Sequence, residues 1–404
     1  MPHEETAEPS AGRRATWIGA GYAAQGFGYA AVVTALPAFK DRQGIDDAYV
    51  SVILLLVCVA AAGGSVLADK VAARWGSRFA LSGGLLTVAV GLGLTAFHTP
   101  TPIFTAILIA YGVGLGAVDA SLSMQGVLVQ ARIGRSVMSR LFAAYTAAAI
   151  LAALLMSGFS ASGNAAALAV GAAAVVAAVV AGGSFTSLEP GRTVMPELAE
   201  LAGEKRHDGT RHIVWVCGAF IFTAFLADSA VSTWSSVYLD DSLTASAAVV
   251  PLGYAAYQAA VLVARLAGDH IVPRLGRIPS AAACLLICAA GCGIVVAVPS
   301  IPVAIAGFGL TGIGVGVLVP LAFSSAGEAA PGHSDEVIAR VNLFNYGGAL
   351  VGAVLLGALS DPIGLRLGFL IPVLGLLATI PVVRSLRHLA TAPTTMTPPA
   401  TAPR

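Results

Sequence analysis

The chain has 404 residues, of which 57% are hydrophobic and 11% charged, and its formal net charge is +1. A soluble domain carries about 25% charged residues, so this composition excludes a water-soluble globule. The nearly balanced charge gives no indication of a nucleic-acid partner. Apolar runs of about 18 residues or more recur along the chain, long enough to cross a hydrocarbon core of ~30 Å as helices. We therefore expect an integral membrane protein whose surroundings are the lipid bilayer.

Apolar runs between charged, Pro-marked or Gly-marked breaks predict an all-α membrane protein with twelve transmembrane helices. The expected spans are 16–38, 48–68, 79–98, 103–129, 141–160, 165–187, 212–237, 247–267, 278–298, 301–326, 341–360 and 367–386. This predicts a tail (1–15), a six-helix half (16–187), a central loop (188–211), a second six-helix half (212–386) and a Thr- and Pro-rich tail (387–404). That last composition is typical of a segment without fixed structure.

The basic residues orient these spans. All but three of the 22 Lys and Arg residues fall in the two tails and in loops near 69–78, 130–140, 188–211, 265–277 and 327–340. The exceptions are Lys40, Arg42 and Arg366. Positive charge favours the cytoplasmic side, so we expect a multi-pass protein of the inner (plasma) membrane with both termini, and both tails, in the cytoplasm.

Two patterns suggest a cofactor but are better explained by packing. Cys284, Cys288 and Cys292 share one helix face, where a metal or redox role is possible, but small apolar filler is the better interpretation. "GFGLTG", which starts at Gly307, matches a dinucleotide-binding pattern but lies inside a span with no preceding strand. The sequence also has no P-loop lysine motif. We expect no metal, no cofactor and no enzymatic activity.

The chain repeats itself at an offset of 200 residues. Charged residues, prolines and glycines recur with their type unchanged, which chance rarely produces at one fixed offset. The matching pairs are Asp69 and Asp269, Arg74 and Arg274, Gly76 and Gly276, Pro102 and Pro302, Gly112 and Gly312, Gly114 and Gly314, Gly116 and Gly316, and Arg140 and Arg340. The chain is therefore a duplicated six-helix unit, with its halves related as parallel repeats.

"SVLADKVAARWGSR" resembles the signature loop between the second and third helices of the major facilitator superfamily, although Ser65 replaces a Gly and extra residues precede Gly76. Together with "DASLSMQGVLVQARIGRSVMS", "STWSSVYLDD" and "ARLAGDHIVPRLG", this longer form resembles the fucose-permease-like branch. The resemblance implies two pseudo-symmetric halves, a substrate site between them and transport by alternating access. It also implies that the charged loops form a cytoplasmic gate, which comprises Asp69, Arg74, Arg78, Arg140, Asp269, Arg274 and Arg340.

Ionisable groups inside spans are costly and so are the first functional candidates. Apart from groups near helix ends, Asp119 in the fourth span and Asp228 in the seventh remain, with no Lys or Arg expected in the membrane interior. A buried carboxylate without a cationic partner relieves its desolvation by taking a proton, which is what a proton-coupled carrier needs. The alternative is a structural role, with each Asp bonded to nearby hydroxyls such as Ser123 or Ser232.

Further polar residues on the spans could line a substrate cavity. Amides, hydroxyls and aromatic faces suit a small polar, mostly uncharged solute. For each residue alone, a hydrogen bond between helices is an equally good explanation. The candidates are Gln25, Tyr29, Ser123, Ser232, Trp234, Tyr254, Tyr257, Gln258, Asn342 and Asn345.

These features favour a monomeric secondary transporter that imports a small polar organic solute together with protons. The alternative is a proton-driven exporter of a metabolite or toxic compound. The Gly-rich, Pro-containing motif of drug/proton antiporters is missing from the fifth span, "LFAAYTAAAILAALLMSG", which tilts the choice to import. A membrane receptor that uses the same fold is a remote third alternative, and the sequence does not identify the solute.

Overall fold

The computed structural model describes residues 8–133, 138–188, 210–329 and 334–385, without the side chains of Asp269 and Asn342 among others. The first half consists of long helices joined by short turns. They are α1 (Glu8–Gln43), α2 (Asp47–Trp75), α3 (Ser77–Thr95), α4 (Thr101–Ile133), α5 (Met138–Gly158) with the short η1 (Phe159–Ala161), and α6 (Ala165–Ser187).

The second half follows the same plan but is more interrupted. Its long helices are α8 (Thr210–Val237) with the π-helical η2 (Tyr238–Ser242), α9 (Leu252–Leu275), α10 (Arg277–Ala297), α11 (Ile301–Ala329) and α12 (Ser334–Leu350). The last part is divided into shorter elements, which are the π-helical η3 (Val351–Leu355), α13 (Leu356–Ala358), α14 (Ser360–Gly368), α15 (Leu370–Thr379) and η4 (Ile380–Ser385).

Each of the twelve expected spans coincides with helix. Among the described residues, eight helices are long and apolar enough to cross a membrane, or nine if the bent pair Pro362–Gly368 and Leu370–Ser385 counts as one span. Helices α1 and α9 are not among the eight, and both carry several polar side chains within their length. Helix α1 begins at Glu8, inside the expected tail, and the expected loop (188–211) and C-terminal tail lie mostly outside the described residues.

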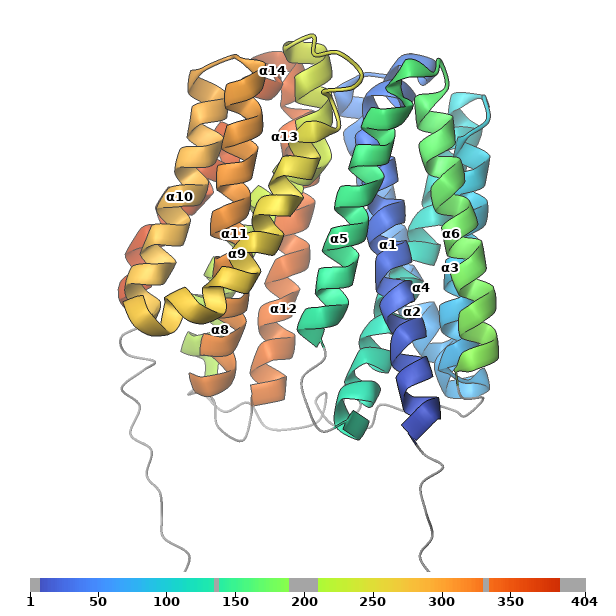
Figure 1. Ribbon diagram of the computed structural model, residues 1–404. Helices are drawn as coiled ribbons and strands as arrows, with labels where there is room; N and C mark the ends of the chain where they lie inside the picture. Colours follow the sequence, from blue (N-terminus) through green and yellow to red (C-terminus); the bar gives the residue numbers. More distant parts are fainter. Residues whose placement is uncertain (1–7, 134–137, 189–209, 330–333, 386–404) are drawn as a thin grey trace, which may run out of the picture.

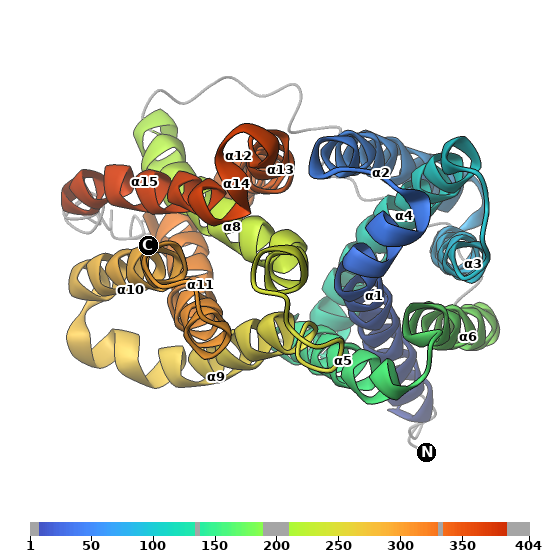
Figure 2. The ribbon, with the colours of Figure 1, turned by 90° about the horizontal axis from the view of Figure 1, so that it is seen from above.

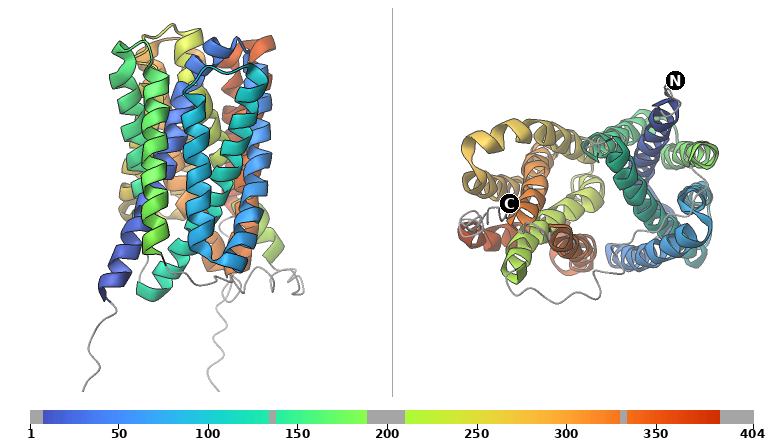
Figure 3. Two further views of the ribbon diagram at one scale, coloured as in Figure 1. Left: turned by 90° about the vertical axis from the view of Figure 1, so that its right-hand side faces the viewer. Right: turned by 90° about the horizontal axis from the view of Figure 1, so that it is seen from below.

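The helices stand side by side in two groups, α1–α6 and α8–α15 (Figures 1 and 2). The near face is defined here as the face where α1 begins, and the far face as the one where α1 ends. Both views in Figure 3 show the same long, roughly parallel bundle of each half. This arrangement is the major facilitator fold, as the resemblance implied.

The 200-residue repeat holds in three dimensions. A Cβ atom placed on Gly116 would lie 1.8 Å from the carbonyl oxygen of Ala61, and one on Gly316 would lie 2.7 Å from that of Val261. The contact partners are themselves 200 residues apart. Helices α4 and α11 therefore approach α2 and α9 at equivalent, glycine-lined contacts, as small residues permit in membrane bundles.

The turns after α2 and α9 are equivalent as well. Gly76 has φ 102° and ψ 153°, and Gly276 has φ 85° and ψ 155°. Because only glycine adopts this conformation without strain, the repeated glycine sets the sharp reversal into α3 and α10.

Among the described residues, buried apolar side chains of the two halves merge into one cluster on the far-face side. The largest cluster combines the first half with far-face residues of the second half, including Trp234, Tyr238 and Phe369. A separate cluster fills the near-face part of the second half, from Ile213 to Val383, and a small one around Ala68 and Met124 lies near the same face of the first half. The halves are thus packed together at the far face and apart at the near face.

The glycine contact predicts a stability difference between two otherwise similar substitutions. Gly116→Ala should destabilise the protein by about 1–3 kcal/mol, because the new methyl group must displace the backbone of α2. Gly171→Ala is the matched control, since a Cβ there meets nothing within 4 Å. Melting temperatures of the two purified variants provide the measurement. Equal melting temperatures would contradict the close contact between α2 and α4.

Candidate functional site between the two halves

A lysine bridges the halves at the far face. Lys40, in the last turn of α1, contacts carboxylate oxygens of Asp47 in α2 and Asp241 in η2. The Lys40 and Asp47 side chains are each 11% exposed and that of Asp241 is 34% exposed, so part of the charge is withdrawn from solvent. Asp241 belongs to the other half and lies 201 residues away in sequence, so this ion triad fastens the two halves together.

The other two basic residues of the far face stabilise helix ends. Arg42 donates to the carbonyl oxygen of Thr95 at 2.7 Å, at the end of α3. Arg366 donates to the carbonyl oxygens of Val296 (2.6 Å) and Ala297 (3.1 Å), at the end of α10. Both satisfy carbonyl groups that a helix leaves open and place positive charge at its negative end.

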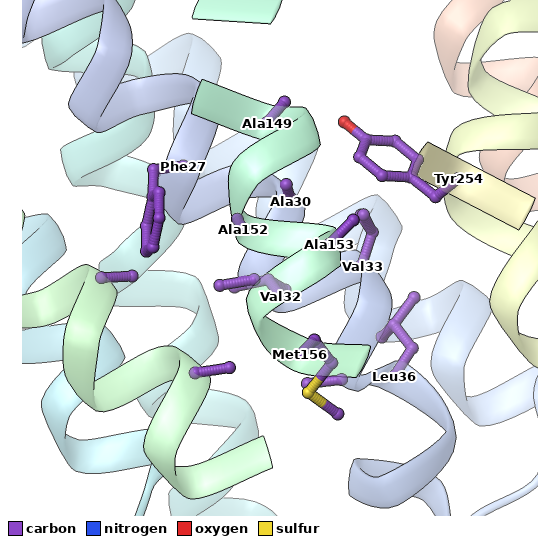
Figure 4. Packing of buried hydrophobic residues seen from close by; sticks show 14 of the residues in the cluster. Phe27, Ala30, Val32, Val33, Leu36, Ala149, Ala152, Ala153, Met156 and Tyr254 are labelled. Carbon is purple, nitrogen blue, oxygen red and sulfur yellow. The ribbon is translucent and has the colours of Figure 1, made fainter. Parts of the chain in front are cut away.

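Helices α5 and α9 form a second link between the halves. At the far face, the Ser157 hydroxyl donates to the carbonyl oxygen of Ala248 at 2.5 Å. Deeper in the bundle, Nη1 of Arg265 lies 3.4 Å from Oγ1 of Thr146. The cluster between α1 and α5 includes Ala149, Ala152 and Ala153 of α5, and the Tyr254 hydroxyl points toward α5 near Ala149 (Figure 4).

Only part of the proposed near-face gate lies among the described side chains. Asp69 is exposed, and within the described part of the chain it forms no ion pair. Arg74 lies over the Trp75 ring, and Arg78 lies over Phe79 and Phe185. Arg140 and Arg274 are exposed, Arg340 is half-buried, and the side chain of Asp269 is outside the described part. The gate therefore stays a prediction for the state in which the near face closes.

Asp119 lies on the wall of the first half. Nε2 of Gln25 in α1 donates to its Oδ1 at 3.1 Å. Gln25 is 9% exposed, whereas Asp119 and Ser123, one turn apart on α4, are exposed. Two of the expected residues thus meet here, and the Asp119 carboxylate belongs to an exposed residue.

Asp228 is the centre of a tyrosine-rich group. Its Oδ1 accepts a hydrogen bond from the Tyr257 hydroxyl at 2.5 Å. Tyr254 accepts one from Nε2 of Gln258 at 2.7 Å. The side chains within electrostatic range of Asp228 come from both halves and are Tyr29, Tyr145, Tyr254, Tyr257 and Arg265.

Arg265 lies inside α9 rather than at its end. The sequence analysis placed Arg265 where the expected span 247–267 meets the charged loop near 265–277, but α9 continues for ten further residues to Leu275. Arg265 therefore lies about 15 Å inside the helix end. Its position in sequence offered a signal, because it follows Tyr254, Tyr257, Gln258 and Val261 on one helical face.

The remaining cavity candidates differ in their surroundings. Trp234 is fully buried, donates to the carbonyl oxygen of Ala353 at 2.8 Å and packs where Gly357 approaches Ser51 of the other half. Ser232 is 2% exposed. Asn345 is half-buried, and the side chain of Asn342 lies outside the described part. In this conformation Trp234 thus packs between the halves.

The cysteines and acidic groups provide no described metal centre. All five cysteines are free thiols, and Cys284, Cys288 and Cys292 are buried. Sγ of Cys288 contacts the Thr311 carbonyl oxygen of α11 at 3.4 Å. Among the described residues no group of three or more His, Cys, Asp or Glu side chains could hold a metal ion.

The chain is similar in sequence to known membrane transporters. The family model of the major facilitator superfamily matches residues 216–403. An uncharacterised transporter of the major facilitator type from Yersinia pestis is 28% identical over 374 residues, covering 91% of this chain and 94% of that protein. An uncharacterised transporter from Sinorhizobium fredii is 27% identical over 368 residues, covering 90% and 95%.

Solved structures share the fold at low sequence identity. A bacterial homologue of the human lysosomal transporter Spinster, in an inward-facing and unoccupied conformation, has a TM-score of 0.73 at 12% identity, covering 95% of this chain and 98% of that one. A mutant of the nucleoside transporter NupG has a TM-score of 0.72 at 11% identity, covering 92% and 99%. The chain is thus similar in sequence to transporters of the major facilitator type and shares its fold with these solved transporters.

The ion triad predicts how the far face opens. Lys40→Ala should raise the population open to the far face about tenfold, which corresponds to about 1.4 kcal/mol, because two partly buried carboxylates lose their shared cation. The readout is the labelling rate of Thr233→Cys, a buried position on α8, in a cysteine-free background with a membrane-impermeant maleimide. Lys70→Ala, at an exposed near-face position, is the control. Equal labelling in both variants would show that the triad does not hold this face closed.

Proposed function

We propose that the chain is a secondary active transporter that imports a small polar organic solute together with protons by alternating access. The observation that supports this most is the asymmetric packing of the halves. Their apolar cores merge at the far face and separate at the near face, with two acidic groups on the surfaces between them. A site reached from one side at a time is what alternating access requires.

The same proposal assigns the sides of the membrane. The basic near-face residues favour the cytoplasmic side, so both termini face the cytoplasm of the plasma membrane and this conformation is open inward. In this reading two halves (16–187 and 212–386), joined by the loop (188–211), rock against each other in a monomer. Lys40 holds the two halves together on the outer side in this state. The Asp69 and Asp269 loops hold them together on the inner side in the outward-open state.

The depths of the two acids fit a route for protons. At 1.5 Å per residue, Asp228 lies about 14 Å from the far-face end of α8, and Asp119 about 27 Å from the far-face start of α4. A proton taken up at Asp228 from outside would be released near Asp119, which is exposed toward the open near face. Each acid bonds a neutral side chain, Tyr257 or Gln25, rather than forming an ion pair.

The coupling role of the acids is testable in proteoliposomes. Asp228→Asn keeps the shape and hydrogen bonding of the side chain but cannot titrate, so the variant should exchange solute across the membrane without accumulating it. Solute accumulation under an imposed pH difference is measured, with a solute chosen because it raises the melting temperature of the protein. Asp119→Asn should behave alike if the two acids form a relay and should only slow transport if Asp119 is structural. Wild-type accumulation by Asp228→Asn would remove Asp228 from the mechanism.

The near-face gate yields a separate expectation. In the state closed to the cytoplasm, Asp69 should lie within about 4 Å of a basic side chain, with Arg140 the leading partner. Asp69→Asn should therefore shift the population toward the inward-open state more than it weakens solute binding. A structure of the outward-open state with Asp69 unpaired would show that this loop does not gate the protein.

A further inference from the structure

Arg265 is the one feature of the central region that the proposed function leaves without a role. It lies within α9, is half-buried and faces α5 of the other half through Thr146. A guanidinium at this depth is expensive unless its donors are satisfied or it acts on a ligand or ion.

Few of the hydrogen-bond donors of this guanidinium have a side-chain acceptor among the described residues. It has five N–H donors, and its hydrogen bond to another side chain in the described region is the long one, 3.4 Å, to Thr146. The Thr146 hydroxyl donates its proton to the carbonyl oxygen of Phe142 at 3.0 Å, so its oxygen acts as the acceptor toward Arg265. Within the described residues, most of the planar donor surface of Arg265 is therefore free of side-chain acceptors.

Asp228 does not form an ion pair with Arg265 either, among the described residues. Asp228 is within electrostatic range of the guanidinium, yet the described residues contain no ion pair between them. The Tyr257 hydroxyl holds one oxygen of Asp228 instead. The charges of Asp228 and Arg265 thus influence each other, but Asp228 does not accept a hydrogen bond from the guanidinium in the described structure.

We propose that Arg265 binds the carboxylate of a monoanionic organic solute in the space between the halves. A carboxylate matches the planar, two-pronged donor geometry of a guanidinium. Of the tyrosines around Asp228, the half-buried Tyr29 and Tyr145 supply hydroxyl groups and aromatic surface for the rest of the molecule, whereas Tyr254 and Tyr257 are fully buried. This proposal rests on the proposed transport function. It specifies the solute as an organic anion, where the sequence analysis expected a mostly uncharged one.

The same geometry couples the anion to a proton. While Asp228 is ionised, its negative charge balances Arg265 and repels a second carboxylate. Once Asp228 takes up a proton, the positive charge of Arg265 is unbalanced and attracts the solute. The ionisable groups within range of Asp228 in the described region are the four tyrosines and Arg265, so protonation of Asp228 changes the local charge most. Proton and anion each favour binding of the other, and they travel together without net charge.

The test uses the full-length protein in detergent and matched pairs of probes. A panel of small monocarboxylates is compared with the corresponding neutral amides, benzoate with benzamide and lactate with lactamide among them. The readout is the rise in melting temperature at acidic and alkaline pH, converted to a dissociation constant. We expect carboxylates to bind more tightly than their amides, and more tightly at acidic than at alkaline pH.

Variants of Arg265 and Asp228 test whether these two residues cause the preference for carboxylates. Arg265→Gln should weaken carboxylate binding at least tenfold and leave any amide binding unchanged, and Arg265→Lys should restore part of the affinity because it keeps the charge but loses the fork. Asp228→Asn should bind carboxylates at alkaline pH as tightly as the wild type does at acidic pH. Arg384→Gln, at an exposed arginine outside the site, is the control.

Three results would overturn the proposal. These are amides that stabilise the protein as well as their carboxylates, carboxylate binding that survives in Arg265→Gln, and a panel in which no carboxylate binds. Uptake of an uncharged solute that is unaffected by Arg265→Gln would overturn the anion site and leave the transport function standing. Carboxylate binding that depends on Arg265, without transport in proteoliposomes, would leave the site standing and remove the transport function.

Discussion

The contact of Lys40 with two carboxylates is the interaction on which this conformation depends. It joins the end of α1 to the start of α2 and, through Asp241, to the π-helical end of α8 in the other half. Because the apolar core also crosses between the halves at this face, the ion triad and the packing around Trp234 close the same side. The cost of the partly buried charges is offset by their mutual attraction, and the opposite face is left open.

Within each half, close helix contacts hold the shape that lets the halves move as units. Helix α4 approaches α2, and α11 approaches α9, at glycines that leave no room for a side chain. The two carboxylates inside the bundle are bonded to neighbouring polar side chains, Asp119 to Gln25 and Asp228 to Tyr257. Such partners reduce the cost of an ionisable group in apolar surroundings.

Sequence alone predicted the helical spans, the duplication and the acidic residues of the interior, because hydropathy and a fixed repeat are local signals. It missed the far-face ion triad, since Lys40 and Asp241 lie 201 residues apart and neither position looks unusual by itself. Arg265 was placed in a loop because a charged residue near the end of an apolar run resembles a helix end, although α9 continues to Leu275. The burial of Trp234 between the halves depends on tertiary packing that composition does not encode.

Distances between spin labels on the two halves test alternating access most directly. One pair replaces Lys70 and His270 at the near face, and the other replaces Asp41 and Ala247 at the far face, all of them exposed positions. Electron-spin distance measurements are made on both pairs at acidic and alkaline pH, with and without a solute that stabilises the protein. The account predicts two populations that exchange reciprocally, so that the near-face distance shortens as the far-face distance lengthens. Distances that change in the same direction, or do not change at all, would contradict it.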